Sequence, residues 1–245
     1  INVPIIGDTV YENTETFTVN LATPTNATIA TAVATGTIVN DDTAPTITVS
    51  APTVTEGNAG TVNLVYTITR TGLTDLAVNF NYATADGTAL VSDNDYVAGS
   101  GTGTIAAGGA TATTTVTVVV NGDTKFELND TVLLNLTAIT NSLNTTASGT
   151  GTITNDDAQP TITITGNSQN EGNSGSANMP FTVTLSNASY QTITVTYSTA
   201  NGTATVANND YTSTTGTLTF TSGVTSQTIN VPIIGDTVYE NTETF

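Results

Sequence analysis

The 245-residue chain contains no cysteine, histidine or tryptophan, and only two of its residues are basic. Without cysteine, disulfide bonds and thiolate metal sites are excluded. Without histidine, the usual Ser-His and Cys-His catalytic pairs are excluded as well. A net charge of −18 argues against nucleic acid and anionic membranes as partners, because both are bound by basic surfaces. No apolar run is long enough to span a bilayer, so we expect neither nucleic-acid binding nor membrane insertion.

The sequence repeats itself at a long and regular interval. The stretch INVPIIGDTVYENTETF at residues 1–17 recurs unchanged at residues 229–245. Glu56-Gly57-Asn58 recurs as Glu171-Gly172-Asn173, an offset of 115 positions that several other motifs share. Solenoid repeats are shorter, at roughly 20–50 residues, whereas an immunoglobulin-like sandwich has about 100. The sequence therefore predicts a tandem array of whole domains.

Asn-Asp-Asp triplets at residues 40–42 and 155–157 divide this array into three parts. The first segment, residues 1–42, is interpreted as the C-terminal part of one module. The middle segment, residues 43–157, is interpreted as a complete module, and the last segment, residues 158–245, as a module that lacks its final strands. Because their sequences are identical, residues 1–17 and 229–245 are expected to adopt the same backbone in equivalent positions of a continuous array.

The pattern of apolar residues predicts strands throughout the chain. Val62, Leu64, Tyr66 and Ile68 alternate with polar residues, as in strands with one buried and one solvated face. The same alternation recurs in three further runs, which are Val78, Phe80 and Tyr82, then Val116, Val118 and Val120, then Val132, Leu134 and Leu136. Threonine, valine and isoleucine are abundant, and such β-branched residues favour strands over helices. We therefore predict an all-β fold in which each module is a two-layer sandwich.

Acidic residues recur at the same places in every module. Of the 20 acidic residues, only Asp75, Asp86 and Asp93 lie outside the repeated motifs. The others are Asp8, Glu12, Glu15, Asp41 and Asp42 in the first segment, Glu56, Asp95, Asp123, Glu127, Asp130, Asp156 and Asp157 in the middle segment, and Glu171, Asp210, Asp236, Glu240 and Glu243 in the last segment. Carboxylates gathered at one pole of a sandwich raise one another's pKa, and a hard cation removes that repulsion. Oxygen ligands without histidine or cysteine favour calcium over zinc or copper.

Several motifs occur in order and together resemble the Calx-beta domain. They are Glu-Gly-Asn, Thr-Ala-Asp-Gly-Thr-Ala followed by Asn-Asp-Tyr, Gly-Asp-x-x-x-Glu-x-x-Glu-x-Phe, and a closing Asn-Asp-Asp. The resemblance covers the whole chain. It implies immunoglobulin-like seven-stranded β-sandwiches arranged as a rod, with Ca2+ bound by loops at one end of each sandwich. In the middle segment it implies that the repeated acidic residues and the backbone carbonyl of Lys125 are ligands, with the equivalent residues in the other segments.

Three residues of the middle segment depart from the pattern that the resemblance implies. Lys125 stands where both other copies have valine, and it brings a cation to the expected site. Asp130 is shorter than the glutamate of the other copies, and Asn155, also a candidate metal residue, begins the closing triplet with a neutral side chain. Each departure lowers the negative charge or the reach of the ligand set. We therefore expect about one to three ions per module.

Three functions are compatible with repeated acidic loops on a sandwich. Paired carboxylates can hydrolyse glycosides, but catalytic sites are rarely copied into every module, and we expect no enzyme. A glycan-binding adhesin module would need exposed aromatic platforms, which the alternation places in the core, although a sugar held through calcium stays an alternative. The leading hypothesis is a calcium-stiffened structural segment of a long extracellular surface, adhesin-like or filament-forming protein.

The positions of the acidic triplets predict where calcium acts. Asp156 and Asp157 end one module, and the next strand run begins at Thr161, directly after Pro160. An ion that ties these carboxylates to the loop carrying Asp123 would limit bending of the next module, and the proline stiffens the same link. The expected partners are neighbouring modules of the same or identical chains, with cell-surface or matrix glycans as the alternative.

Overall fold

The computed structural model describes residues 1–245 and divides the chain into two compact units. Unit 1 comprises Ile1–Glu56, Thr61–Asn121 and Asn129–Thr154, and unit 2 comprises Gly57–Gly60, Gly122–Leu128 and Asn155–Phe245. The regular structure consists of strands and two short 3-10 turns, so the predicted all-β fold class is confirmed. No helix has the length and apolar character needed to cross a membrane.

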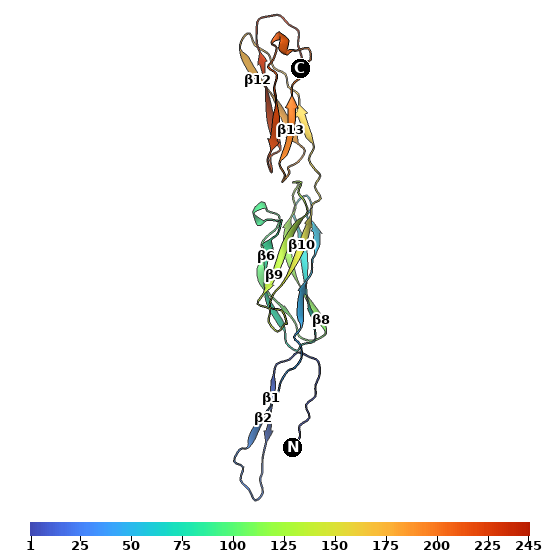
Figure 1. Ribbon diagram of the computed structural model, residues 1–245, viewed down its shortest axis with the longest axis vertical. Coiled ribbons are helices and arrows are strands. Elements are labelled where there is room, and N and C mark those ends of the chain that lie inside the picture. Colours follow the sequence, from blue (N-terminus) through green and yellow to red (C-terminus); the bar gives the residue numbers. More distant parts are fainter. The chain divides into compact units, whose positions relative to one another are not determined.

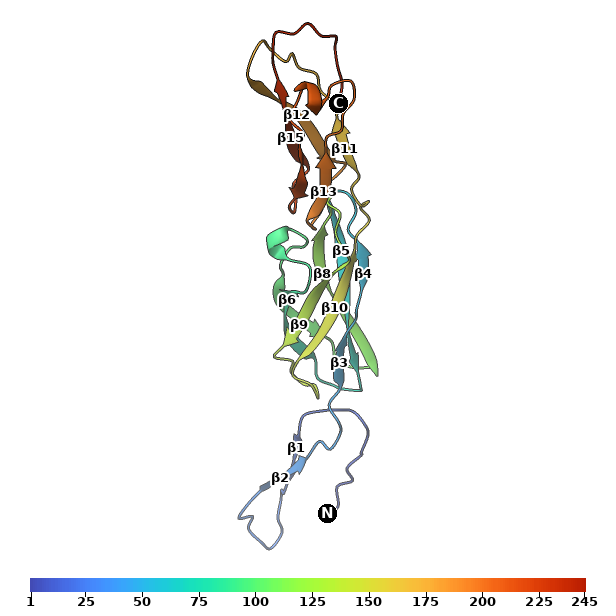
Figure 2. The same cartoon turned by 45° about the horizontal axis from the view of Figure 1, so that its top comes forward.

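The middle segment forms a two-sheet sandwich within unit 1 (Figures 1 and 2). Its strands are β3 (Thr46–Val49), β4 (Thr53–Thr55), β5 (Thr61–Thr71), β6 (Val78–Asp86), β7 (Ser100–Ile105), β8 (Thr111–Asn121), β9 (Asp130–Thr137) and β10 (Ala147–Thr154). One sheet has the order β3-β5-β8 and the other β4-β10-β9-β6-β7. The short β3 and β4 are two parts of one edge strand that changes sheets, since β3 pairs with β5 and β4 pairs in parallel with β10. The seven expected strands therefore appear as eight.

The alternation seen in the sequence fills the space between these two sheets. Leu64, Tyr66 and Ile68 of β5 are buried, whereas the residues between them are more exposed. They share one cluster with buried residues of the opposite sheet, among them Phe80 of β6 and Leu134 of β9. The predicted core residues of the middle segment thus lie in one continuous core.

The hydroxyl of Tyr66 joins the two sheets through hydrogen bonds inside this core. Tyr66 is fully buried on β5, donates to the carbonyl of Val132 at 2.7 Å, and accepts from the amide of Gly151 at 3.0 Å. A Cβ atom at position 151 would lie 2.5 Å from that hydroxyl, so glycine is required for the close approach. The ring packs as a core residue while the hydroxyl satisfies two buried backbone groups.

The first segment contributes one β-hairpin to unit 1 (Figure 1). Its strands, β1 (Glu15–Asn20) and β2 (Val33–Ile38), pair in antiparallel register. They correspond in sequence position to β9 and β10 of the middle segment, 115 residues later. No residue of this hairpin is fully buried, because the strands that would cover it have no counterpart in residues 1–42.

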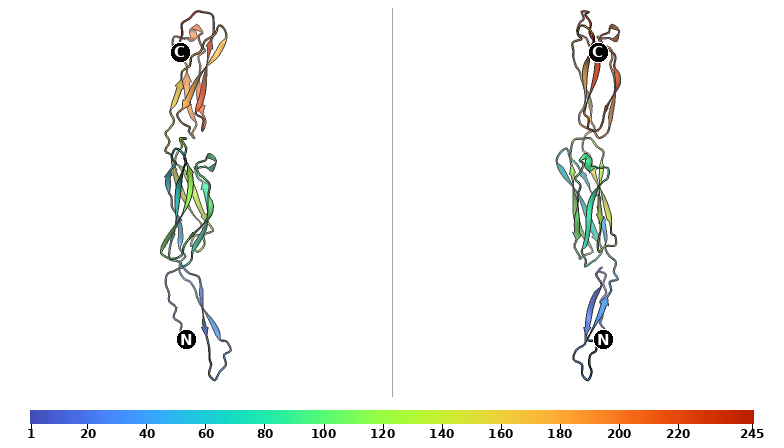
Figure 3. Two further views of the ribbon diagram at one scale, coloured as in Figure 1. Left: turned by 180° about the vertical axis from the view of Figure 1, so that it is seen from behind. Right: turned by 90° about the vertical axis from the view of Figure 1, so that its left-hand side faces the viewer.

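The last segment forms two small sheets within unit 2 (Figure 3). Its strands are β11 (Ile162–Thr165), β12 (Ser176–Leu185), β13 (Ile193–Ser198), β14 (Thr215–Phe220) and β15 (Ser226–Ile234). One sheet has the order β11-β12-β15, and β13 pairs with β14. Buried residues from both sheets, including Val183, Phe220 and Val231, make a second core.

The two identical stretches, residues 1–17 and 229–245, adopt different structures at both of their ends, so the expectation of a shared backbone along their whole length is wrong. Residues 229–234 belong to β15, pair with β12, and bury Ile229 and Val231. Residues 1–6 form no strand, and Ile1 and Ile6 are almost fully exposed. The opposite holds at the other end of the stretch, since residues 15–17 begin β1 whereas residues 243–245 lie outside any strand. Each half is ordered as a strand only where its pairing partner is present.

Tyr66→Phe is expected to destabilise the middle segment by about 1–3 kcal/mol, because it leaves a buried carbonyl and a buried amide without their partner. The free energy of unfolding can be obtained from urea-dependent hydrogen exchange of core amides in the full chain. The amide of Gly151 should show the largest loss of protection.

Tyr82→Phe is the matched control, because it removes a hydroxyl from a ring of the same segment that is only half-buried. An equal free-energy change in the two variants would contradict the role given to the Tyr66 hydroxyl.

Candidate metal centre

The Asn-Asp-Tyr motif builds a rigid turn that presents one carboxylate. In the last segment it follows η2 (Val206–Asn208), where Asn209 has a left-handed backbone with φ of 64°, a conformation that asparagine tolerates better than most residues. One oxygen of Asp210 accepts the amide of Thr205 at 2.6 Å. The middle segment repeats this turn after η1 (Val91–Asp93), where Asp95 accepts the amide of Leu90 at 2.7 Å.

The tyrosine of this motif anchors the turn in the core. Tyr96 and Tyr211 are both buried. Tyr96 donates its hydroxyl proton to Asp86 at 2.6 Å, and Tyr211 donates to Asn201 at 2.8 Å. Because asparagine replaces aspartate in one copy, the contact does not need the charge. Asp86 is the last residue of β6, and Gly87 follows it. The chain then continues through η1 before β7 begins at Ser100, so this Asp-Gly pair does not form a tight hairpin turn.

Three acidic side chains of the last segment converge at the end of this turn. Asp210, Glu240 and Glu243 are half-buried, and their carboxylate oxygens all lie within 4.8 Å of one another. Partial burial raises the pKa of Glu240 above its ordinary value, and the charges of Asp210, Asp236 and Glu171 raise it further. All five acidic residues predicted for this segment therefore belong to one electrostatic cluster.

The chain holds Glu243 in this cluster through its two neighbours. Thr244 donates its amide to the Thr203 hydroxyl at 2.8 Å, and its carbonyl accepts the amide of Ala204 at 2.9 Å. Phe245 stacks on Tyr211 with ring centroids 4.6 Å apart. Partial burial, followed by the charge of Asp210 and a hydrogen bond with it, raises the pKa of Glu243.

The first segment gathers its acidic residues in the same way. Partial burial and the charge of Asp8 raise the pKa of Glu12. Partial burial and the charges of Asp41 and Asp8 raise the pKa of Asp42. Asp8 and Asp42, which are 34 positions apart in the sequence (42 − 8), thus repel one another across a single site.

Asp75 is a member of this first cluster that the sequence analysis missed. It belongs to the middle segment, yet its carboxyl group hydrogen-bonds with that of Glu12 and its charge raises the pKa of Glu12, as does the charge of Glu15. Position 190 in the last segment, 115 residues later, is tyrosine. Because the acid is not repeated, the comparison of copies carried no signal for it.

In unit 2, the loop 122–128 and the closing triplet bring together part of the middle segment's predicted set. Partial burial raises the pKa of Asp157, and the charges of Asp156 and Asp123 raise it further. One carboxylate oxygen of Asp157, Oδ2, is buried without a hydrogen-bond partner. Asp156 accepts the amide of Gly57 at 3.0 Å, which ties the Glu-Gly-Asn motif to the triplet.

The side chain of Lys125 pairs with an acidic residue of the predicted set. Its Nζ lies 2.5 Å from Oε1 of Glu127, and both side chains are largely shielded from water. The ammonium group therefore neutralises a carboxylate that the other two copies leave beside valine. The sequence predicts a cation near the site, and the structure identifies Glu127 as the carboxylate that it pairs with.

In unit 1, the remaining predicted residues of the middle segment lie on three separate elements. Glu56 follows β4 and is 4% exposed, and Asp95 follows η1 and is 8% exposed. Asp130 begins β9 and is half-buried. Asp93, which the sequence analysis also set aside, has a carboxylate oxygen within 4.8 Å of one of Asp95. Burial of two carboxylates in so small a domain is uncommon without compensating charge or hydrogen bonds.

The asparagine of the closing triplet braces the acidic loop. The side-chain oxygen of Asn40 accepts the amide of Glu12 at 3.2 Å, and that of Asn155 accepts the amide of Glu127 at 3.2 Å. Each asparagine also donates to the backbone carbonyl two residues later. The neutral asparagine that begins each triplet thus holds the backbone of the glutamate in the acidic loop, which is Glu12 or Glu127.

Comparison with known proteins identifies one domain family along the whole chain. A sequence model of the Calx-beta domain matches residues 1–42, 40–165 and 155–245. No curated protein sequence matches this chain.

Solved structures show weaker similarity. The chain is 22% identical to CBD12 from CALX1.2, covering 76% of this chain and 75% of that one with a TM-score of 0.37. It is 23% identical to the calcium binding domain CBD12 of CALX1.1, covering 77% and 76% with a TM-score of 0.37. It is 20% identical to the apo-form Calx CBD1 domain, covering 46% and 99% with a TM-score of 0.36.

The clustered carboxyls predict an unusual pH dependence in the absence of divalent ions. The pKa values of Glu240 and Glu243 are raised in the folded chain above their ordinary value of 4.5. The folded state therefore binds protons at a higher pH than the unfolded state does, and these groups make stability rise as pH falls from 7 toward 4.5. Thermal melts in excess chelator at a series of pH values in this window measure the effect.

The double variant Glu240→Gln and Glu243→Gln should weaken this response, because its side chains do not titrate. Two results would contradict this explanation. One is a wild-type melting midpoint that decreases as the pH is lowered from 7 toward 4.5. The other is a double variant whose melting midpoint changes with pH as strongly as that of the wild type.

Proposed function

The chain belongs to the Calx-beta domain family, and from this premise we propose that its modules bind Ca2+ and act as a calcium-stiffened structural segment. We propose further that the segment is part of a long extracellular surface, adhesin-like or filament-forming protein. The repeat period, the absence of cysteine and the scarcity of basic residues support an array of this kind. The functional unit is then the module together with its junction to the next one.

The convergence of Asp210, Glu240 and Glu243 carries the proposal. Three carboxylate oxygens within 4.8 Å of one another are mutually repulsive unless a proton or a cation lies among them. Calcium accepts six to eight oxygen ligands at about 2.3–2.6 Å in flexible geometry. Glu171 and Asp236 stand in the same electrostatic cluster, so the donor set is all oxygen and suits a hard cation better than zinc or copper.

The middle segment supports the same chemistry in unit 2. Asp157 Oδ2 is buried without a hydrogen-bond partner, which costs free energy unless a cation or water reaches it. The charges of Asp123 and Asp156 act on the same carboxyl group. These three carboxylates would hold the ion, and the ion would supply the positive charge that this cluster lacks.

Calcium binding would act on the junctions because the acidic loops themselves contact the following segment. In unit 1, Tyr11 is hydrogen-bonded to Leu73 and Asp75, and the adjacent Glu12 lies in the acidic cluster. In unit 2, Phe126 is hydrogen-bonded to Ala188. An ion that fixes the loop therefore restrains the backbone that carries the junction, and its loss would leave the loop to the repulsion of its carboxylates.

Isothermal titration of the full chain with calcium tests the proposal. Glu240→Gln should remove the ion or ions bound by the last segment, because it replaces one carboxylate of the converging set with a neutral amide. Calcium should also raise the melting midpoint, since binding to the folded state alone adds about 2.7 kcal/mol at a hundredfold excess over Kd.

Asp86→Asn is the matched control for Glu240→Gln. It removes the same unit of charge, and asparagine already makes the equivalent contacts at Asn201 in the last segment. Its calcium stoichiometry should equal that of the wild type. Absence of calcium heat in the wild type, or equal stoichiometry in Glu240→Gln, would refute the proposal.

Lys125→Val is expected to tighten calcium binding by the middle segment. Valine is the residue of the other two copies, and its introduction frees the Glu127 carboxylate from a paired ammonium. An ion pair of this kind is worth about 1 kcal/mol, which corresponds to about a fivefold change in Kd.

Lys125→Arg keeps the positive charge and should leave calcium affinity near that of the wild type. The comparison of the two variants by titration calorimetry separates the effect of charge from that of side-chain packing. Equal affinities for Lys125→Val and Lys125→Arg would show that the ammonium does not compete with calcium.

A further inference from the structure

A pair of backbone hydrogen bonds joins the first segment to the middle segment within unit 1. The amide of Tyr11 donates to the carbonyl of Leu73 at 3.2 Å, and the carbonyl of Tyr11 accepts the amide of Asp75 at 3.2 Å. The hydroxyl of Thr74, between these two residues, also donates to the Tyr11 carbonyl at 3.0 Å. Tyr11 and Thr74 therefore form a short parallel bridge. We call this two-bond arrangement the backbone clamp.

The same clamp recurs in unit 2, 115 positions later. The amide of Phe126 donates to the carbonyl of Ala188 at 2.9 Å, and its carbonyl accepts the amide of Tyr190 at 3.1 Å. Phe126 and Ser189 form the corresponding parallel bridge. Only backbone atoms are common to the two clamps, while leucine is exchanged for alanine and aspartate for tyrosine. The contact is therefore a property of the repeat and does not depend on one pair of side chains.

The accepting loop is held in shape by its own segment. The Thr74 hydroxyl accepts the amide of Leu76 at 2.9 Å, and the Thr74 carbonyl accepts the amide of Gly108 at 2.7 Å. Ser189 makes both bonds in the last segment, at 3.1 and 3.0 Å. Thr74 and Ser189 are buried. A threonine or serine at this position thus stabilises the loop to which the preceding segment binds. We call this loop, residues 73–75 and 188–190, the receptor loop.

The segment that inserts into this loop is shaped by a turn of its own, and it occurs three times. An aspartate side chain accepts the amide two residues later at Asp8, Asp123 and Asp236, with distances of 2.8, 2.6 and 2.7 Å. Three residues beyond each aspartate stand Tyr11, Phe126 and Tyr239. The offset from the second to the third copy is 113, which matches the two residues by which β15 is shorter than β8.

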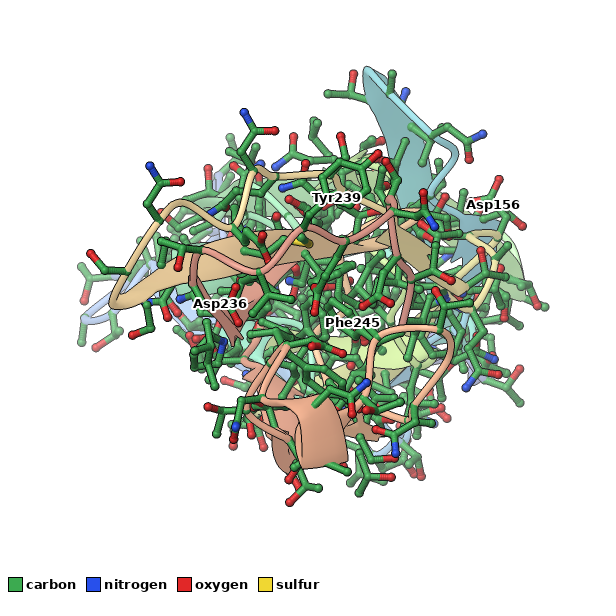
Figure 4. All side chains as sticks on the ribbon, turned by 90° about the horizontal axis from the view of Figure 1, so that it is seen from above. Asp156, Asp236, Tyr239 and Phe245 are labelled. Atoms are coloured by element: carbon green, nitrogen blue, oxygen red, sulfur yellow. The ribbon has the colours of Figure 1, made fainter.

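The third copy differs from the others in its exposure. Tyr239 is 94% exposed and Val238 is 61% exposed, whereas Tyr11 and Phe126 are partly buried. Figure 4 shows the loop that carries Asp236 and Tyr239 crossing the face of the last segment that is turned toward the viewer. Residues 238–240 thus follow the same aspartate turn as the other two copies, and Val238 and Tyr239 are exposed to solvent.

We propose that residues 238–240 are the docking surface for the receptor loop of a further module of this same repeat, bound by the backbone clamp. The occupant carries threonine or serine at the position of Thr74 and Ser189. A second copy of this chain does not supply it, because its two receptor loops are already occupied by its own Tyr11 and Phe126. The clamp consists of backbone hydrogen bonds and includes no calcium ligand, so it can be detected with or without the ion that, under the proposed function, restrains the same loop.

Hydrogen exchange of the Tyr239 amide tests the proposal in two extended chains. Phe245 corresponds to position 132 by the offset of 113, so the full chain can be continued in register with a second copy of residues 133–245. The receptor loop of that copy would reach Tyr239 and slow its exchange by about tenfold or more, the effect of two backbone hydrogen bonds. The amides of Tyr11 and Phe126 serve as internal references for a closed clamp.

The control is the full chain continued with residues 133–157 alone, which completes the last segment without adding a receptor loop. Protection of Tyr239 in the longer chain only, in calcium and in chelator alike, supports the docking surface. Protection in both extended chains, or in neither, overturns it. Self-association of the unextended chain through residues 238–240 would overturn the choice of occupant.

Discussion

One local contact underlies both the acidic clusters and the junctions, namely the aspartate side chain that accepts the amide two residues later. It bends the backbone at the start of each acidic loop, at Asp8, Asp123 and Asp236. Aspartate favours this turn because its short carboxylate reaches its own backbone without strain. The turn is followed by the aromatic residue that makes the backbone clamp at Tyr11 and Phe126, and then by a glutamate of the acidic loop. Charge and junction are therefore coupled through neighbouring residues.

The composition makes this coupling sensitive to cations. With two basic residues in 245, the chain has almost no internal counter-charge for its carboxylates. One of the two, Arg70, is buried and donates hydrogen bonds to the carbonyls of Gly108 and Gly109. It therefore stabilises the loop whose Gly108 amide donates to Thr74. The other, Lys125, is paired with Glu127. Positive charge for the other acidic loops has to come from solution, which is the basis of the proposed role of calcium.

Much of the fold followed from sequence because the relevant signals were repeated and local. Alternation in β5, β6, β8 and β9 predicted the core, since it reflects the two faces of a strand. Comparison of copies identified the acidic residues of the last segment, which the structure brings into one cluster. Asp75 and Asp93 were missed because their copies are tyrosine and asparagine. The clamp could not be predicted from the sequence, because it is made by backbone atoms. Its only sequence signals are a threonine or serine in the receptor loop and a tyrosine or phenylalanine in the inserting segment.

The structural difference between the two identical stretches has a consequence for correct strand pairing during folding. Since INVPII becomes a strand wherever a β12-type edge is free, either copy could in principle pair with the other's edge, which is the error that leads to domain swapping in repeat proteins. The corresponding residues of the module in between, 116–121, read VTVVVN and lack that identity. The strand sequence differs between neighbouring modules and is identical only between modules two repeats apart. A strand that mispairs with the adjacent module therefore meets an edge that matches it less well.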